Sequence, residues 1–400
     1  MRYAMITFSK FPDDPRVRRE AEALAESGWT LDVICIGAPL QPQFETMGNI
    51  HVFRANMSRT RLNKTWYFKA YASFWMFAFF RLVRMHLKSM YKVVHVHNMP
   101  DALVFCALIP RLYGARVVLD LHDPMPEVFM AKYKVSGRHP LIRVIKFLER
   151  VSIRFADLVV TPNTAFRERF IQRGAPERKM HIIMNSPQES LFNVANTGAK
   201  TACDGYQIMY HGYIAERNGL DVAAKALSML RKKIPNMRFH IYGGGDVIPQ
   251  LLQVIDLLNL KEVTTYHGGV SIDVIAQAIP RIDLGIIPNR STPFTRINLP
   301  TRIFEYLCMN KPVIAPRTRG ILDYFNEDEL FFFRPGDADD LVRVIARVYS
   351  NPEWVNETVR KGVKVYQRYR WQHQKRELLT LIESMLGNGC RGAGACEVDT

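Results

Sequence analysis

The sequence predicts an α/β protein made of two consecutive domains, each built on a mainly parallel β-sheet. Apolar runs of the length of buried strands alternate with helical stretches over residues 1–190. A small, polar segment follows at residues 191–204, and the same alternation then starts again. The last helical stretch, at about residues 353–386, is long enough to reach back to the first half. This alternation is typical of doubly wound folds.

The first half, residues 1–190, forms a predicted N-terminal domain. Its first strand spans residues 3–9 and leads into an amphipathic helix at 16–28, which ends at Gly28 because glycine is common just past a helix. Further buried strands are predicted at residues 31–37, 93–97, 116–122, 156–162 and 181–185.

The second half, residues 205–365, forms a predicted C-terminal domain. Residues 191–204 are predicted to link the two domains, residues 366–386 to form a helix that returns to the first, and the glycine-rich residues 387–400 to be a disordered tail. Strands are expected at residues 207–212, 238–245, 263–268, 282–288, 313–315 and 329–337, with helices at 219–233, 247–260 and 303–309.

The composition is that of a globular protein with a strongly basic charge. The chain is 48% hydrophobic and 23% charged, with a formal net charge of +16. Nine basic and no acidic residues lie between Glu45 and Asp101, which favours anionic partners such as phosphates, nucleic acid or a membrane. The six scattered cysteines form no CxxC pair, and the N-terminus lacks the long apolar core of a signal peptide. We therefore expect reduced thiols and a cytoplasmic location.

The segment at residues 62–92 interrupts this pattern with a run of aromatic residues. Its uncharged stretch, residues 70–80, has 11 residues, too few for a helix that crosses a membrane. Two interpretations stay open for residues 66–90. The helix can lie in an anionic membrane surface, which its all-basic charged face slightly favours, or it can be a buried helix that covers the sheet. The polar face consists of Lys69, Ser73, Arg81, Arg84 and Lys88.

Two glycine-containing stretches of the second half are candidates for binding a diphosphate. Residues 210–221 (YHGYIAERNGLD) place Gly212 and Arg217 between a strand and a helix. Residues 241–246 (IYGGGD) place Gly243 and Gly244 directly after a strand. Backbone N–H groups in such turns can bind phosphate, above all beside an arginine. The G-x-G-x-x-G fingerprint is missing after the first strand, which argues against a dehydrogenase.

A third stretch, residues 298–316 (NLPTRIFEYLCMNKPVIAP), is a candidate for holding both a phosphate and a ribose. A helix is expected to begin near Thr301 and Arg302, with Glu305 one turn later. We expect Arg302 and the helix N-terminus to hold phosphate, and the Glu305 carboxylate to accept both hydroxyls of a ribose diol. The alternative is that Glu305 is only a favourable charge near a helix N-terminus, worth about 0.3–1 kcal/mol.

Polar residues also follow three strands of the first half, at the edge where ligands of α/β sheets bind. We expect His122 to donate hydrogen bonds to a ligand at this edge, and the other residues to line the same cleft or hold an acceptor. The alternatives are a structural His122, and an Asp14 that is only a turn residue before the helix. The candidates are Asp14, Arg16, His97, Asn98, His122 and Asp123.

Taken in order, these stretches resemble the family 4 glycosyltransferases of the GT-B fold, over residues 1–386. The matching stretches are residues 13–34 (DDPRVRREAEALAESGWTLDVI), 156–187, 210–227, 241–246, 266–288, 299–316 and 368–386. The resemblance implies two Rossmann-like domains that face each other across a cleft, with the C-terminal helix crossing back to the N-terminal domain. It also implies a nucleotide-diphospho-sugar donor bound mainly to the second domain.

The resemblance further implies roles for individual residues. Glu305 matches the ribose-binding second glutamate of the family's E-x7-E motif, His122 the histidine that faces the reacting sugar, and Gly212 and Arg217 the phosphate loop. Such enzymes need no metal and retain the anomeric configuration. Front-face displacement is implied, in which the departing diphosphate helps to deprotonate the acceptor while Arg217 and Arg302 stabilise its charge.

The chain departs from the family pattern at three positions. Ile297 stands where the first glutamate of E-x7-E, which usually holds the donor sugar, is expected. Tyr213 stands where many members have arginine, and Asn218 where many have lysine.

The leading hypothesis is a retaining, metal-independent glycosyltransferase that acts on a lipid-linked or cell-surface polysaccharide precursor. The segment at 62–92 would hold it peripherally on the anionic inner face of the membrane. The alternatives are a sugar-nucleotide epimerase or hydrolase of the GT-B fold, and a non-catalytic membrane-bound GT-B partner protein, which the missing glutamate motivates. A nucleic-acid partner is not expected, because only the basic charge supports one.

Overall fold

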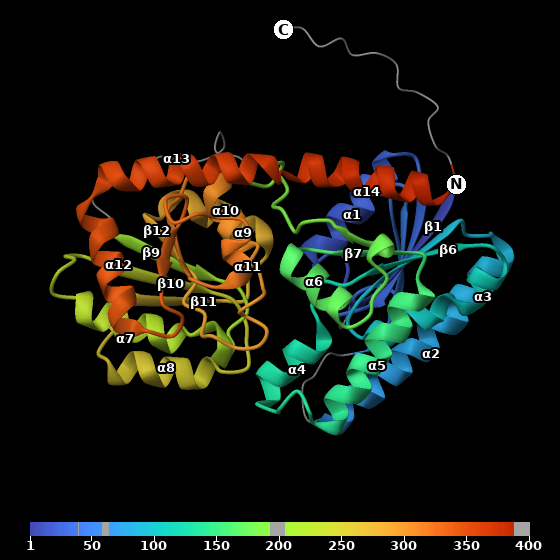
Figure 1. Ribbon diagram of the computed structural model, residues 1–400, viewed down its shortest axis with the longest axis horizontal. Coiled ribbons are helices and arrows are strands. Elements are labelled where there is room, and N and C mark those ends of the chain that lie inside the picture. The colour runs from blue at the N-terminus through green and yellow to red at the C-terminus, as the bar shows by residue number, and fades with distance from the viewer. Residues whose placement is uncertain (39, 58–63, 193–204, 388–400) are drawn as a thin grey trace, which may run out of the picture.

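The computed structural model describes residues 1–38, 40–57, 64–192 and 205–387. They form two α/β domains that lie side by side, each with its own sheet (Figure 1). Most of the predicted linker and nearly all of the predicted tail lie outside the described residues. In the described part of the chain, no helix combines the length and apolarity that crossing a membrane requires.

The N-terminal domain is built on an eight-stranded sheet in the order β3-β4-β2-β1-β5-β6-β7-β8, in which only β3 runs antiparallel to its neighbour. The strands are β1 (Arg2–Lys10), β2 (Thr30–Ile36), β3 (Phe44–Met47), β4 (Ile50–Ala55), β5 (Val93–His97), β6 (Arg116–Asp120), β7 (Leu158–Thr161) and β8 (Met180–Ile182). The helices are α1 (Pro15–Glu26), α2 (Lys64–Lys88), α3 (Leu108–Leu112), α4 (Met125–Tyr133), α5 (Pro140–Phe155) and α6 (Thr164–Gln172). Apolar cores lie on both faces of this sheet.

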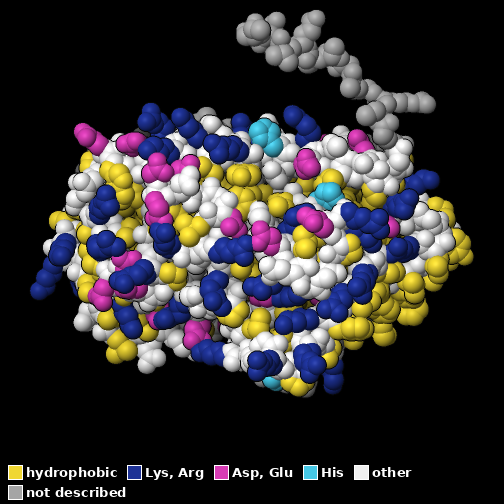
Figure 2. Space-filling model, viewed as in Figure 1, with side chains coloured by type: hydrophobic (Ala, Val, Ile, Leu, Met, Phe, Trp, Pro, Cys, Tyr) yellow, Lys and Arg dark blue, Asp and Glu magenta, His cyan; other side chains and the backbone are white. Residues whose placement is uncertain are grey.

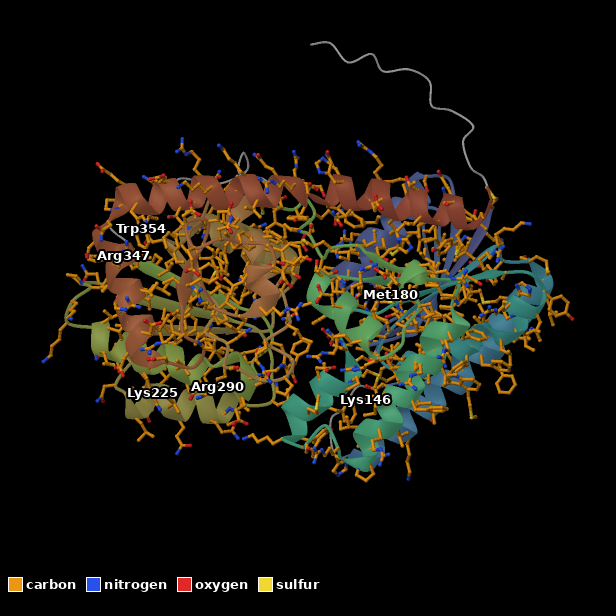
Figure 3. All side chains as sticks on the ribbon, in the orientation of Figure 1. Lys146, Met180, Lys225, Arg290, Arg347 and Trp354 are labelled. Atoms are coloured by element: carbon orange, nitrogen blue, oxygen red, sulfur yellow. The ribbon has the colours of Figure 1, made fainter. Side chains whose placement is uncertain are left out.

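The C-terminal domain is built on a six-stranded parallel sheet in the order β11-β10-β9-β12-β13-β14. Arg347 of α12 (Ala338–Ser350) lies over the ring of Trp354 of α13 (Pro352–Arg368), 4.0 Å from its centroid (Figure 3). The strands are β9 (Gln207–His211), β10 (Arg238–Tyr242), β11 (Thr264–Gly268), β12 (Leu284–Ile286), β13 (Val313–Pro316) and β14 (Phe331–Phe333). The helices are α7 (Leu220–Leu230), α8 (Ile248–Leu257), α9 (Ile272–Ala278), α10 (Arg302–Cys308), α11 (Arg319–Leu322), α12 (Ala338–Ser350), α13 (Pro352–Arg368) and α14 (Trp371–Met385).

Helix α2 covers the sheet of the N-terminal domain, as one of the two interpretations of residues 66–90 required. Ala70, Phe74, Ala78 and Leu82 are spaced by four residues and are buried in the apolar core. The opposite face exposes apolar side chains, Met76, Phe80 and Leu87, next to basic ones. The burial of α2 does not decide whether this exposed face meets a membrane, which stays a prediction.

The end of the chain returns to the N-terminal domain, but it does so as a second helix. The stretch expected at about 353–386 is broken at Tyr369 and Arg370, so the returning helix, α14, begins at Trp371 instead of residue 366. Helices α13 and α14 together run along one edge of both domains (Figure 1). Leu378 and Ile382 of α14 are buried in the core beside α1.

Candidate functional site

A cavity of about 540 Å³ lies between the two domains, at the carboxyl ends of their central parallel strands. The strand order reverses beside β1 in one sheet and beside β9 in the other, and ligands of open α/β sheets bind at such switch points. Ten of the predicted site residues line it, namely Arg16, His122, Asp123, Gly212, Arg217, Gly243, Gly244, Thr301, Arg302 and Glu305. Three do not, namely Asp14, His97 and Asn98.

Two glycine turns pass each other at the donor side of the cavity. Gly212 has φ +122° and Gly243 has φ +140°, a region that favours glycine. A Cβ atom on Gly243 would lie 1.9 Å from the carbonyl oxygen of Gly212. A Cβ atom on Gly244 would have no neighbour within 4 Å. Close backbone approach therefore requires Gly243, whereas Gly244 faces open space.

The arginines of the donor side have different surroundings. Arg302 donates from Nη1 to the carbonyl oxygen of His211 at 2.6 Å and lies 4.7 Å above the ring of Tyr210. Arg217 lies 5.5 Å from the centroid of the Phe294 ring. Burial lowers the pKa of Arg217, although the carboxylate of Asp123 opposes this. Both cations line the cavity, where an anionic ligand would meet them.

Glu305 is not a simple surface charge at a helix N-terminus. It is 8% exposed, and its Oε2 lies 2.5 Å from Nε2 of His211. The other ring nitrogen, Nδ1, lies 2.9 Å from the hydroxyl of Tyr306. Burial lowers the pKa of His211, although Glu305 opposes this. His211 therefore orients one carboxylate oxygen of Glu305. The buried Glu305 is not an exposed surface charge, but it does lie in the first turn of α10, so the alternative of a favourable charge near a helix N-terminus stays open. The role of Glu305 toward a ribose stays a prediction.

The structure explains one of the departures from the family pattern. Asn218 is 7% exposed, and its side-chain amide donates to the carbonyl oxygen of Tyr213 and, at 3.2 Å, to the hydroxyl of Tyr210. Asn218 thus closes the loop after β9 instead of offering a charge. The hydroxyl of Tyr213 donates to Asp246 at 2.6 Å. Ile297 is 4% exposed and packs in an apolar core, so it does not take the place of a sugar-binding glutamate.

On the opposite wall, Asp14 and Asn98 support the loops that carry Arg16 and His122. Asp14 caps α1 by accepting from the backbone N–H of Arg16, as its alternative interpretation held, and it forms an ion pair with that side chain at 3.2 Å. Although burial opposes it, Arg16 lowers the pKa of Asp14 to about 2. Asn98 accepts from the backbone N–H of His122 at 2.9 Å and donates to the carbonyl oxygen of Asp123 at 2.8 Å.

His122 lies on the cavity wall with one ring nitrogen turned into the domain. Its Nε2 lies 3.2 Å from Nδ1 of His97 and 3.3 Å from Oδ2 of Asp120. Burial and the charge of Arg16 lower the pKa of His122 well below its ordinary value, so the ring is neutral near pH 7. Sequence reasoning missed Asp120, although its position two residues before His122 at a strand end was a usable signal. It also missed His211, which no pattern singled out.

The comparisons with known proteins agree with this architecture. Residues 14–186 match the glycosyl transferase 4-like domain and residues 205–351 match the glycosyl transferases group 1. Curated relatives include the alpha-D-kanosaminyltransferase of Streptomyces kanamyceticus, 21% identical over 279 residues, and the amylovoran biosynthesis glycosyltransferase AmsK of Erwinia amylovora, 20% identical over 254 residues. The first alignment covers 65% of this chain and 68% of the relative, and the second covers 63% and 62%.

Solved structures match over nearly the whole length of the chain. The sucrose-phosphate synthase of Thermosynechococcus elongatus superposes with a TM-score of 0.78 at 17% identity, over 97% of this chain and 100% of that one. The HepE protein of Anabaena in complex with UDP superposes with a TM-score of 0.68 at 16% identity, over 96% and 100%. At these identities the likeness establishes the two-domain fold.

Proposed function

Because the chain belongs to the family 4-like glycosyltransferases of the GT-B fold, which transfer a sugar from a nucleotide sugar, we propose that it retains the anomeric configuration and needs no metal. We further propose that its acceptor is a lipid-linked or cell-surface polysaccharide precursor at the cytoplasmic face of a membrane. The observation that carries the proposal is the cavity that both domains share. Among the described residues of its C-terminal wall, Arg217 and Arg302 face a single acidic side chain, Glu305.

In the proposed reaction, the C-terminal domain binds the donor through its charged groups. The diphosphate lies by the turn at Gly212, next to Arg217 and Arg302, and the ribose lies by Glu305. As the bond from the sugar to the diphosphate breaks, charge grows on the leaving oxygen, and one preorganised donor at such a position is worth about 3 kcal/mol. The departing diphosphate takes the proton of the acceptor hydroxyl, which attacks from the same face of the sugar. His122 lies on the opposite wall, near the reacting groups.

The proposed membrane contact rests on a surface formed by α2, α3 and α5, called here the α2–α5 face. Figure 2 shows hydrophobic side chains gathered over these helices at the lower right. Their acidic residue, Glu149 of α5, is 1% exposed, so the surface itself is apolar and basic. Each Lys or Arg near an anionic membrane contributes about 1 kcal/mol. Exposed residues include Met76, Phe80, Arg84, Lys88, Leu112, Tyr113, Arg143, Val144, Phe147 and Leu148.

A thermal-shift screen tests the proposed donor. The protein is mixed with UDP, GDP, ADP, CMP, dTDP and their sugar conjugates, with and without EDTA. A ligand at 100 times its dissociation constant adds about 2.7 kcal/mol of stability, so a shift with one nucleotide that EDTA leaves unchanged is expected. No shift with any nucleotide would overturn the proposal and favour the non-catalytic alternative. Turnover of the donor without an acceptor would favour an epimerase or hydrolase.

Sedimentation with vesicles tests the proposed membrane contact. Binding to vesicles that contain anionic lipid is expected to fall with salt and to fall further in a Phe80→Ser/Phe147→Ser double variant. The matched control is Leu257→Ser, because Leu257 is 74% exposed on α8 of the other domain. Equal binding of all three proteins would show that the α2–α5 face is not the contact. Equal binding to oligonucleotides would show that the basic charge acts without selectivity.

A further inference from the structure

A cluster of buried polar side chains lies directly behind His122, away from the cavity wall. It consists of Glu20 from α1, His95 and His97 from β5, and Asp120 from β6. Each is at most 4% exposed, and one polar atom of each lies within 4.8 Å of the others. Burying two carboxyl groups and two imidazoles is costly unless protons and charges are matched between them. The arrangement therefore needs a definite assignment of protons.

Asp120 and His97 are the members that contact His122. Oδ2 of Asp120 lies 3.2 Å from Nδ1 of His97 and 3.3 Å from Nε2 of His122. A neutral imidazole carries one N–H, and a carboxylate oxygen can only accept. Nδ1 of His97 also lies 3.2 Å from Nε2 of His122, so only one of these two nitrogens carries the proton between them. With Asp120 accepting from His97, that proton is on Nδ1 of His97, and Nε2 of His122 accepts. The proton of His122 is then on Nδ1, so the ring donates a hydrogen bond at that atom instead of accepting one.

Glu20 supplies the remaining proton of the cluster. Burial and the charge of Asp120 raise the pKa of Glu20 to about 8. Burial raises the pKa of Asp120 to about 7, although the charges of Arg16 and Arg19 and a hydrogen bond from Glu20 lower it. Two carboxyl groups this close in a buried site cannot both ionise without a large cost. Because Asp120 also lies 3.2 Å from Nδ1 of His97, from which a carboxylate can accept, the proton is placed on Glu20 and the charge on Asp120.

A divalent cation is the competing occupant, because two histidines and two carboxylates are ligands that zinc accepts. The His95 and His97 rings, however, are stacked, with centroids 4.4 Å apart and an interplanar angle of 24°. Each lone pair lies in the plane of its ring, so the lone pairs of two stacked rings lie in nearly parallel planes, whereas the ligands of a tetrahedral ion converge on one point. A shared proton fits this geometry better than a metal does.

We propose that Glu20 and Asp120 share one proton, and that Asp120 thereby holds the His122 ring in a single tautomer and orientation for sugar transfer. Both are positioning residues, since neither lines the cavity. The inference rests on the proposed function, because it assigns what supports His122 during that reaction. A glutamine at position 20 can still donate to Asp120 through its amide, whereas an asparagine at position 120 loses the charge that accepts from Nδ1 of His97.

The test compares steady-state kinetics of Asp120→Asn, Glu20→Ala and Glu20→Gln with the full-length protein, using the donor that the thermal-shift screen identifies. Asp120→Asn and Glu20→Ala are expected to lower kcat at least 10-fold, with the donor KM changed less than 3-fold. Glu20→Gln is expected to restore kcat to within about 3-fold. The matched control is Asp32→Asn, because Asp32 accepts from Nδ1 of His51 at 2.9 Å and from Tyr91 but does not line the cavity.

The outcomes separate this inference from the proposed function. An unchanged kcat in Asp120→Asn overturns the inference and leaves the transferase proposal intact. A loss in Glu20→Gln as large as in Glu20→Ala shows that Glu20 acts as an ion, which also overturns it. Stoichiometric zinc or iron in the purified protein would assign the cluster to a metal. If the protein turns over no donor, the proposed function fails, and the dependence of folding stability on pH in Glu20→Gln still tests the shared proton.

Discussion

Replacing Glu20 with glutamine should remove most of the pH dependence of stability that this buried carboxyl imposes. Burial and the charge of Asp120 raise its pKa from the ordinary 4.5 to about 8 in the folded protein. Between these pH values, folding takes up a proton, so the free energy of unfolding falls as pH rises. The full contribution is present below about pH 4.5 and is lost as pH rises through 8. At 1.36 kcal/mol per pH unit, the loss between pH 5 and pH 8 is about 4 kcal/mol.

The groups that face Glu20 define what else can titrate in this window. They come from four elements and are Arg16 and Arg19 of α1, Tyr3 of β1, His95 and His97 of β5, and Asp120 of β6. Burial lowers the pKa of both histidines, so they stay neutral across most of the window. Asp120 shares its proton with Glu20, and a variant with glutamine at position 20 leaves Asp120 ionised near pH 7.

Urea unfolding followed by tryptophan fluorescence at pH 5, 6, 7 and 8 measures this effect. The difference in unfolding free energy between Glu20→Gln and the wild type should move in favour of the variant by several kcal/mol as pH rises. Asp14→Asn is the control, because Arg16 lowers the pKa of Asp14 to about 2 despite its burial. The contribution of the Asp14 carboxylate is lost only as pH falls below about 4. The difference in unfolding free energy between Asp14→Asn and the wild type should therefore stay constant from pH 5 to pH 8. A flat difference for Glu20→Gln would refute the shared proton.

Three further substitutions test the donor side of the cavity. Glu305→Gln is expected to weaken nucleotide binding about 10-fold, seen as a smaller thermal shift, with little change in melting temperature without ligand; unchanged binding would contradict the ribose contact. Gly243→Ala is expected to lose more than about 3 kcal/mol of unfolding free energy because its Cβ would meet a carbonyl oxygen at 1.9 Å, whereas Gly244→Ala should lose less than about 1. Asn218→Lys, which restores the common family residue, should destabilise the loop by about 1–3 kcal/mol and weaken nucleotide binding, because a buried amide donor is lost; tighter binding would contradict this reading.

The sequence was sufficient to predict the two-domain fold and the edge of each sheet at which a ligand binds. The alternation of apolar runs and helices predicts strands that run in the same direction, and their carboxyl ends then meet at one edge of the sheet. Ten of the thirteen predicted site residues reached the cavity for this reason. The other three, Asp14, His97 and Asn98, follow the same strands, but their side chains contact other residues of the domain and do not line the cavity.

The pairing of side chains across elements was beyond sequence reasoning. The partner of Glu305 is His211, which lies 94 residues earlier in the chain, and that pairing depends on the rotamers of both residues. The sequence could not show whether Asn218 binds phosphate, as the lysine common at this position does, or has a structural role. Its hydrogen bond to the Tyr213 carbonyl oxygen shows the structural role. For α2, periodicity marked a polar face but left a wide apolar surface, and packing alone showed which part of that surface the sheet covers.

The register of the N-terminal sheet explains why the cluster behind His122 exists at all. The parallel pairing of β5 and β6 sets His97 opposite Asp120, and His95, two residues before His97, points to the same face. Helix α1 packs on that face and brings Glu20 to it. The donor contacts, by contrast, come from the C-terminal domain. Because the two sets of residues belong to different domains, a change at Asp120 should lower kcat without altering donor affinity. The relative size of the changes in kcat and in donor KM therefore shows which domain a substitution has disturbed.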